Sequence, residues 1–190
     1  MLAHYHGQLF NVSEIGTSLG INYKTAQSYL DILESTFMIR QLTSWVANIK
    51  KWQVKSPKIY FCDSGLLHSL LGISTYNDLL GHPKLGSSWE GFAIEQVIRT
   101  LRVDHESCFY WRTQNGAELD LLVFENGKLR GVEFKFSSKP SLTKSLHSVL
   151  EDLNPSDLTI ILPGSENYLI HEKVRVYGLQ VFCQTPSMHL

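Results

Sequence analysis

The chain has 190 residues, of which 43% are hydrophobic and 18% are charged, and its formal net charge is −1. This size allows one domain or two small ones with buried cores, and no apolar run reaches the roughly 20 residues that span a bilayer. The N-terminus MLAHYHGQLF lacks the basic and long apolar segments of a signal peptide, and three widely spaced cysteines fit reduced thiols, so we expect a cytoplasmic protein without membrane association.

Basic residues are concentrated in the first sixty positions. This part carries six lysines and arginines against three acidic residues, a balance of +3, so the rest of the chain balances to −4. A basic segment joined to an acidic one favours two modules, of which the first faces phosphates.

Residues 11–35, NVSEIGTSLGINYKTAQSYLDILES, have the layout of a helix-turn-helix. Ser13 is expected to cap a short helix, which Gly20 ends in a left-handed conformation, and Asn22 is expected to cap a second helix. The buried face of the second helix is predicted from residues that recur at helical spacing, namely Ala26, Tyr29, Leu30 and Leu33.

Polar side chains on the first turns of the second helix would enter the major groove of DNA. Strands are expected over residues 37–42 and 58–61, joined by the basic segment ANIKKWQVKSP, which is the order of a winged helix. The alternative is a protein–protein adaptor whose lysines are merely solvated. The predicted nucleic-acid contacts are Lys24, Thr25, Gln27, Ser28, Lys50, Lys51 and Lys55.

The chain is expected to divide into a winged helix-turn-helix over 1–62, a linker with a helix over 63–86, and a second domain over 87–190. The second domain is predicted to begin with a helix capped by Ser87 or Ser88. Three strands, a helix, a strand ending at Pro163 and a last strand over 173–182 follow. Meandering strands and a helical crossover imply a mixed sheet covered by helices.

Two glutamates on the first helix of this second domain are predicted to differ. Glu90 lies four residues before Ile94 and therefore shares the inward, apolar face of the helix. Glu95 is expected to form a solvated ion pair with Arg99 and Arg102.

Residues 116–138, GAELDLLVFENGKLRGVEFKFSS, predict two strands joined by a turn at Asn126 and Gly127. Because residues two apart in a strand point the same way, Glu133 and Lys135 share one face. Asp120, on the neighbouring strand, is expected to lie alongside them. The alternative is an exposed ion pair beside the core, without catalytic function.

Two carboxylates at close range hold their protons unless a cation lies between them, and Mg²⁺ prefers hard oxygen ligands. A lysine beside such a site can stabilise charge on a phosphate. The pattern therefore predicts metal-assisted hydrolysis of a phosphodiester, with Mg²⁺ or Mn²⁺ held by Asp120 and Glu133, Lys135 beside them and Glu90 behind them.

The array Asp120…Glu133-Phe-Lys135, preceded by Gly86-Ser-Ser-Trp-Glu90, resembles the PD-(D/E)XK nuclease superfamily. Longer stretches resemble the C-terminal portion of prokaryotic AAA-type ATPases, a domain of unknown function: HYHGQLFNVSEIGTSLGINYKTAQSYLDILESTFMIRQL, KSPKIYFCDSGLLHSLLG, GSSWEGFAIEQ and GAELDLLV. The resemblance implies an α/β fold, with an N-terminal winged helix-turn-helix followed by a restriction-endonuclease-like mixed sheet flanked by helices. It assigns metal ligation to Asp120 and Glu133, and catalytic roles to Glu90 and Lys135.

In such ATPases a P-loop domain normally precedes both parts, yet no GxxxxGK[ST] occurs in this sequence. The chain is therefore expected not to hydrolyse ATP by that route, and to be a natural short form or part of a longer protein. The partners implied are DNA, an AAA-type ATPase subunit or another copy of the chain. The alternative function is a non-catalytic DNA- or protein-binding regulatory module acting with an ATPase partner, and a third is a structural dimer.

Overall fold

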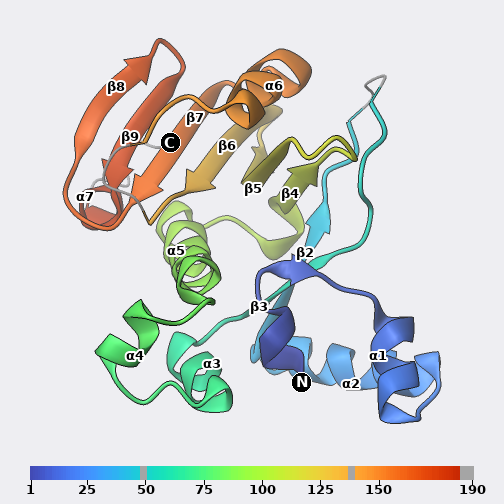
Figure 1. Ribbon diagram of the computed structural model, residues 1–190. Coiled ribbons are helices and arrows are strands. Elements are labelled where there is room, and N and C mark those ends of the chain that lie inside the picture. Colours follow the sequence, from blue (N-terminus) through green and yellow to red (C-terminus); the bar gives the residue numbers. More distant parts are fainter. Residues whose placement is uncertain (48–50, 137–139, 185–190) are drawn as a thin grey trace. The chain divides into compact units, whose positions relative to one another are not determined.

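The structure is a computed structural model that describes residues 1–47, 51–136 and 140–184. The chain forms two compact units that interleave along the sequence (Figure 1). The first unit combines Met1–Leu42 with Ser56–Gly91, and the second combines Thr43–Lys55 with Phe92–Leu190. The chain therefore passes from one unit to the other at three places.

The first unit consists of short helices around a small antiparallel sheet. Strand β3 pairs with β1 and β2, in the registers Gln8↔Ile59 and Leu42↔Lys58. Its elements are η1 (Leu2–Tyr5), β1 (Gln8–Leu9), α1 (Val12–Leu19), α2 (Tyr23–Ser35), most of β2 (Ile39–Ser44), β3 (Lys58–Phe61), α3 (Ser64–Leu71), α4 (Tyr76–Leu80) and the start of α5 (Leu85–Leu101). Its core contains the buried residues Ala3, Phe10, Ile15, Leu30, Ile39, Ile59, Phe61 and Leu67.

Capping residues define the ends of α1 and α2. Asn11 caps α1, because its Oδ1 accepts a hydrogen bond from the Ser13 N–H at 3.0 Å, so the predicted Ser13 cap is wrong. Gly20 ends α1 with a φ of 68°, and the Asn22 side chain accepts the Thr25 N–H at 2.9 Å, which confirms both of those predictions.

The buried face of α2 is narrower than predicted. Ala26 and Leu30 are each 5% exposed, whereas Tyr29 is 57% exposed. Helical spacing placed Tyr29 on the inward face, but the side chain remains in solvent. Helices α1 and α2 are followed by the antiparallel pair β2–β3, and the winged-helix assignment of this arrangement stays a prediction.

The second unit is built on a mixed sheet in the order β4-β5-β6-β7-β9-β8. Strands β6, β7 and β9 are parallel to one another, whereas the pairs β4–β5, β5–β6 and β8–β9 are antiparallel, which confirms the predicted mixed sheet. Its elements are η2 (His105–Ser107), β4 (Cys108–Arg112), β5 (Glu118–Glu125), β6 (Lys128–Phe134), α6 (Lys144–Leu153), β7 (Asp157–Leu162), β8 (Asn167–His171), β9 (Val174–Gly178) and α7 (Leu179–Gln184), with the rest of α5.

Helix α6 packs on one face of this sheet. The Thr143 side chain caps α6 by accepting the Leu146 N–H at 3.3 Å. Leu146 and Val149 of α6 then join a core of buried sheet residues. The sheet residues of this core are Trp111, Leu119, Leu122, Leu158, Ile160, Leu162, Val174 and Val176.

The C-terminal part of the sheet differs from the prediction. Residues 173–182 do not form one strand, because β9 ends at Gly178 and α7 follows it. A Cβ atom at Gly178 would lie 2.1 Å from the Gly164 carbonyl oxygen, so only glycine fits where the chain turns. Strand β8, which pairs with β9 at the edge of the sheet, was missed.

The connection between β2 and β3, predicted as the wing, belongs to the second unit. The Trp45 N–H donates to the Tyr110 carbonyl at 2.7 Å, and the Trp111 indole N–H donates to Gln53 Oε1 at 3.2 Å. The backbone of Gln53 also forms an isolated antiparallel β-bridge with Thr113. These bonds tie the connection to β4 and to the turn after it.

Helix α5 begins at Leu85 rather than Ser87, so the predicted cap at Ser87 or Ser88 is wrong. The Ser88 hydroxyl, 4% exposed as a residue, instead forms a hydrogen bond of 2.7 Å with His68 Nε2 of α3. Because Leu85 and Gly86 are already helical, Ser88 lies within the helix and not at its N-terminus. Its side chain is therefore packed in the protein and does not cap the helix.

Candidate functional site

Strands β5 and β6 meet around the predicted turn. Asn126 and Gly127 have φ values of 52° and 73°, which is the left-handed geometry that an Asn-Gly hairpin turn adopts. The register runs from Glu125↔Lys128 to Leu121↔Val132. The start of β5 and the end of β6 therefore lie together, at the end of the strand pair away from the turn.

Strand β5 carries a bulge at this end. The pairs Phe109↔Leu122 and Trp111↔Leu119 enclose two steps along β4 but three steps along β5. Bulges are common near active sites because the extra residue re-aims a side chain. Leu119 and Leu122 consequently both join the core under α6, and simple alternation no longer fixes the direction of Asp120 between them.

A hydrogen bond fixes the direction of Asp120. Its Oδ2 accepts the Phe134 backbone N–H at 2.9 Å, and the residue is 9% exposed. Since Phe134 lies between Glu133 and Lys135, this bond places the Asp120 carboxylate beside the predicted Glu-x-Lys.

Glu133 and Lys135 form an ion pair next to Asp120. The Lys135 Nζ lies 2.5 Å from Glu133 Oε1. The Glu133 side chain is 6% exposed, whereas that of Lys135 is 39% exposed. The structure therefore brings Asp120, Glu133 and Lys135 together, with two buried carboxylates and one ammonium that reaches solvent.

Glu90 has partners of its own in the first unit. Its Oε1 accepts a short hydrogen bond from the Tyr60 hydroxyl and pairs with Lys58 Nζ at 3.4 Å. The Lys58 side chain is only 4% exposed and that of Glu90 18%. The role predicted for Glu90 beside the strand acids stays a prediction.

Glu95 contradicts its predicted environment. It is 4% exposed, whereas Arg99 and Arg102 are exposed, so a solvated ion pair does not describe it. Helix α5 is buried on more than one side here, because Ala93 and Ile94 directly before Glu95 are both fully buried. This unbroken apolar run in the sequence was the signal for a buried acid.

The predicted DNA contacts on α2 fall into two groups. Lys24 and Ser28 are exposed. Thr25 and Gln27 are engaged locally: the Thr25 hydroxyl donates to Asn22 Oδ1 at 3.2 Å, and Gln27 Nε2 donates to Asp31 Oδ1 at 2.7 Å. Contact with DNA stays a prediction for all four.

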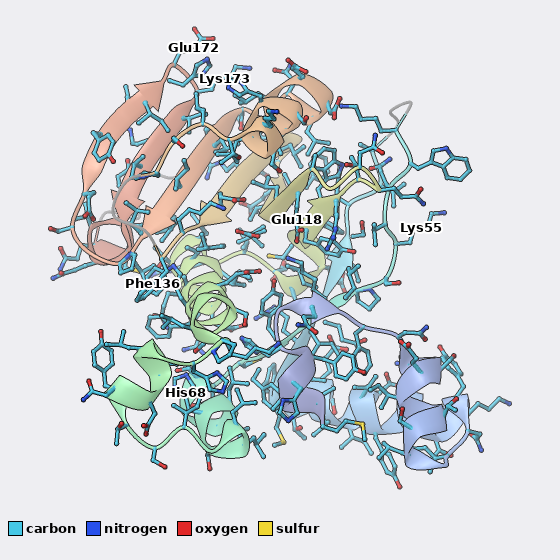
Figure 2. The ribbon with its side chains drawn as sticks, viewed as in Figure 1. Lys55, His68, Glu118, Phe136, Glu172 and Lys173 are labelled. Atoms are coloured by element: carbon cyan, nitrogen blue, oxygen red, sulfur yellow. The ribbon has the colours of Figure 1, made fainter. Side chains whose placement is uncertain are left out.

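The predicted contacts in the β2–β3 connection also differ. Lys50 lies outside the described residues. Lys51 pairs with Asp152 of α6 at 2.7 Å. Lys55 is exposed (Figure 2). Their contact with DNA stays a prediction as well.

The donors at the acid–lysine cluster fit a magnesium site only in part. Within residues 1–47, 51–136 and 140–184, no three His, Cys, Asp or Glu side chains gather in a metal-binding group. Mg²⁺ typically uses one or two carboxylates and completes its shell with water and phosphate oxygens. Asp120 and Glu133 suit that pattern and not an all-protein cage.

The first unit contains a buried histidine, His6. His6 Nδ1 accepts the Phe61 N–H at 3.0 Å, and Nε2 lies 3.0 Å from the Ser87 carbonyl, so Nε2 carries the proton. Burial lowers the pKa of His6 from 6.5 to about 4, although the Ser87 carbonyl acts in the opposite direction and the charge of Lys84 adds to the lowering. His6 is therefore neutral in the folded protein at neutral pH.

The structure thus defines an α/β protein with an acid–lysine cluster at one end of a mixed sheet. Its sequence matches two family models: Domain of unknown function (DUF8612) over residues 1–77 and Domain of unknown function (DUF4143) over residues 85–182. The second model covers more than half of the residues, and the chain belongs to the DUF4143 family.

Curated relatives occur in mycobacteria. The chain is 48% identical over 174 residues to Uncharacterized protein Mb2031c of Mycobacterium bovis and to Uncharacterized protein Rv2008c of Mycobacterium tuberculosis. The alignments cover 92% of this chain and 39% of each relative, so the chain spans about two fifths of their length. In the part of the chain that the structure describes, no helix is long and apolar enough to cross a membrane.

Proposed function

We propose that this chain is a cytoplasmic DNA-binding protein of nuclease-like fold, whose second unit hydrolyses phosphodiester bonds with Mg²⁺ or Mn²⁺. The observation that carries the proposal is the meeting of Asp120, Glu133 and Lys135 at one end of the β5–β6 pair. A second buried acid beside a Glu–Lys pair suits a site for a cation and a phosphate better than it suits a simple structural pair.

Each side chain of the cluster has a separate part. The Phe134 N–H holds the Asp120 carboxylate in one direction before any ligand arrives. Glu133 offers a buried oxygen donor, and the exposed stem of Lys135 lets its ammonium stabilise negative charge on the phosphate. A divalent ion bound to the two acids supplies Lewis-acid polarisation and an activated water.

The first unit supports the DNA-binding part of the proposal. Exposed Lys24 and Ser28 lie on the first two turns of α2, the helix that follows the tight turn at Gly20. In helix-turn-helix proteins these turns of the second helix reach base edges and phosphates. Together with the resemblance to a winged helix, this position supports DNA binding by the first unit.

A nicking assay tests the proposed hydrolysis. Supercoiled plasmid is incubated with the full chain and Mn²⁺ or Mg²⁺, and then with EDTA. We expect Asp120→Asn and Glu133→Gln each to lower the nicking rate about 100-fold or more, the range typical for loss of one essential charged group. Glu125→Gln is the matched control, because Glu125 is exposed at the turn end of the same strand pair.

Calorimetric titration with Mn²⁺ separates metal binding from chemistry. The wild-type chain is expected to bind Mn²⁺, and Asp120→Asn to bind it more weakly, whereas Glu125→Gln leaves binding unchanged. A wild-type chain that binds no divalent ion and nicks no plasmid or branched DNA contradicts the proposal.

A second candidate is a non-catalytic module that docks onto an ATPase partner, in line with the resemblance to AAA-type ATPases. It is favoured by large apolar side chains that the first unit leaves in solvent. On α1, on α2 and two residues after α2 they are Leu19 at 52%, Tyr23 at 54%, Tyr29 at 57%, Ile32 at 55% and Phe37 at 82% exposure. Such groups mark protein-interaction surfaces when they cluster.

Association measured in trans tests this candidate. Ile32→Ser and Phe37→Ser are expected to weaken binding to the ATPase portion of a longer family member about tenfold or more, whereas Lys24→Gln is not. Equal binding by all three variants would exclude this surface as the docking site.

A further inference from the structure

A polar cavity lies in the second unit, at the turn that precedes β5. It has a volume of about 290 Å³ and is lined by the turn after β4, the start of α6 and one residue of the β2–β3 connection. Its polar lining includes the side chains of Lys51, Lys144 and Ser148. A larger cavity of about 360 Å³ lies elsewhere on the sheet, but Asp157 and Asn167 already engage its arginines, Arg130 and Arg175.

The walls of the smaller cavity are held by several hydrogen bonds. In the turn, the Thr113 N–H donates to the Ala117 carbonyl at 2.9 Å and the Ala117 N–H to the Thr113 hydroxyl at 3.1 Å. On α6, the Ser145 hydroxyl accepts the Glu118 N–H and donates to the Glu118 carbonyl, both at 2.6 Å. The cavity is thus preformed, and ordering its walls costs a ligand little.

Two lysines give the cavity its charge. Lys144 is exposed at the first turn of α6. Asp152 holds the Lys51 ammonium at 2.7 Å, and an ammonium has three N–H donors, so two remain beyond this bond. Two ammonium groups against one carboxylate, together with the Ser148 hydroxyl, favour an anion with several acceptor oxygens.

The cavity lies beside the candidate site along β5. Glu118, whose backbone N–H and carbonyl bond to the Ser145 hydroxyl, precedes Asp120 by two residues, a rise of roughly 7 Å along a strand. Figure 2 labels Glu118. Each strand of B-DNA carries one phosphate per roughly 3.4 Å of helix axis. A DNA strand that places one phosphate at the acids therefore has further phosphates within reach of Lys51 and Lys144.

We propose that this cavity binds a backbone phosphate of DNA next to the phosphodiester at the acid–lysine cluster, through Lys51 and Lys144. The proposal rests on the proposed function and names how its site grips the substrate. It also explains why residues of the β2–β3 connection fold with the second unit, since they bring Lys51 to the cavity.

Binding of a labelled DNA duplex to the full chain in EDTA tests the phosphate site without the catalytic step. We expect Lys51→Gln and Lys144→Gln each to weaken binding about threefold to tenfold. The dependence of log K on log salt should become shallower by roughly 0.9 for each phosphate that the variant no longer neutralises. Lys128→Gln is the matched control, because it removes the same charge at the opposite end of the β5–β6 pair.

Asp152→Asn is expected to change DNA affinity in the opposite direction. Removing the carboxylate that competes for the Lys51 ammonium should tighten DNA binding, whereas the same charge change in Glu125→Gln, at the turn, should have a smaller effect. Loss of binding in Asp152→Asn would contradict the proposal.

The outcomes separate this proposal from the proposed hydrolysis. If Lys51→Gln and Lys144→Gln behave like Lys128→Gln while wild-type nicking persists, the phosphate site is wrong and the hydrolysis stands. If they lose DNA binding but the wild-type chain never nicks with Mn²⁺, the phosphate site stands and the hydrolysis is wrong.

Discussion

The two units contain the same kind of ion pair in opposite surroundings. In the first unit Lys58, with a side chain 4% exposed, pairs with Glu90, whose Oε1 also accepts the Tyr60 hydroxyl. In the second unit Lys135, 39% exposed, pairs with the more deeply buried Glu133. The Lys135 ammonium can reach water or a ligand when it leaves its carboxylate, whereas the Lys58 ammonium is buried and cannot. The exposure of the lysine, rather than of the acid, separates a fixed pair from an exchangeable one.

The largest expected effect is on the fixed pair. Lys58→Ala leaves Glu90 without its ammonium partner, and breaking a buried pair in this way costs about 3 kcal/mol or more. The free energy of unfolding from urea titration measures it. Arg112→Ala is the control, with an expected loss below about 1 kcal/mol, because both side chains of the Arg112–Glu118 pair are partly exposed, at 37% and 28%. Equal losses in the two variants would remove the distinction between the pairs.

The next effect concerns pH and the first unit. Because the pKa of His6 is lowered from 6.5 to about 4 by burial, the unfolded chain binds the proton more tightly than the folded one. Stability is therefore full above pH 6.5 and falls as the pH decreases toward 4, by about 3 kcal/mol for His6. Burial also lowers the pKa of His68, which adds loss of the same sign.

Urea titrations between pH 4 and 7, with His6 followed by NMR, measure this dependence. His4→Gln is the matched control, because it replaces a histidine that lies at the surface. A stability that stays constant between pH 7 and 4 contradicts the buried neutral His6.

The exchangeable pair is tested by its chemistry. Lys135→Ala should lower the nicking rate about 100-fold, equal to about 2.7 kcal/mol of transition-state stabilisation, while leaving the fold intact. If Lys135→Ala nicks plasmid as fast as the wild-type chain, the Glu133–Lys135 pair is only structural.

The smallest effect compares two left-handed residues. Phe37 in the first unit has a φ of 58°, and Asn126 in the second has a φ of 52°. Asparagine tolerates this conformation, whereas a bulky side chain is strained by about 1 kcal/mol or more. Because Phe37 is 82% exposed, Phe37→Asn should raise the free energy of unfolding by about 1 kcal/mol. The reverse change, Asn126→Phe, should lower it, and a destabilised Phe37→Asn would show that Phe37 packs usefully.

Local signals predicted the parts of the fold that depend on single residues. Gly20 and Asn22 marked the turn between two helices, and Asn126 with Gly127 marked the hairpin, because few residues adopt these backbone conformations. The mixed sheet followed from the order of strands and helices. The Glu-x-Lys pattern followed from alternation along one strand.

Features that depend on tertiary packing could not be predicted from the sequence. The bulge near Asp120 arises because three residue steps of β5 pair with two steps of β4, and no residue type in β5 indicates it. Glu95 was assigned to solvent because Arg99 lies four residues later, but the packing around α5 buries it. The contacts of the β2–β3 connection join residues about sixty positions apart, such as Gln53 and Trp111, which periodicity cannot reveal.

The interleaving of the two units has a consequence for truncation. A fragment that begins at residue 92 lacks the residues that pair with β4 and the Gln53 amide that receives the Trp111 indole N–H. Such a fragment would expose a sheet edge and a large aromatic ring, and would be prone to aggregate. Excision of the second unit alone calls for a circularly permuted or grafted gene that restores residues 43–55. Joining two genes at a single junction would not produce this arrangement, because residues 43–55 of the second unit lie between two parts of the first unit.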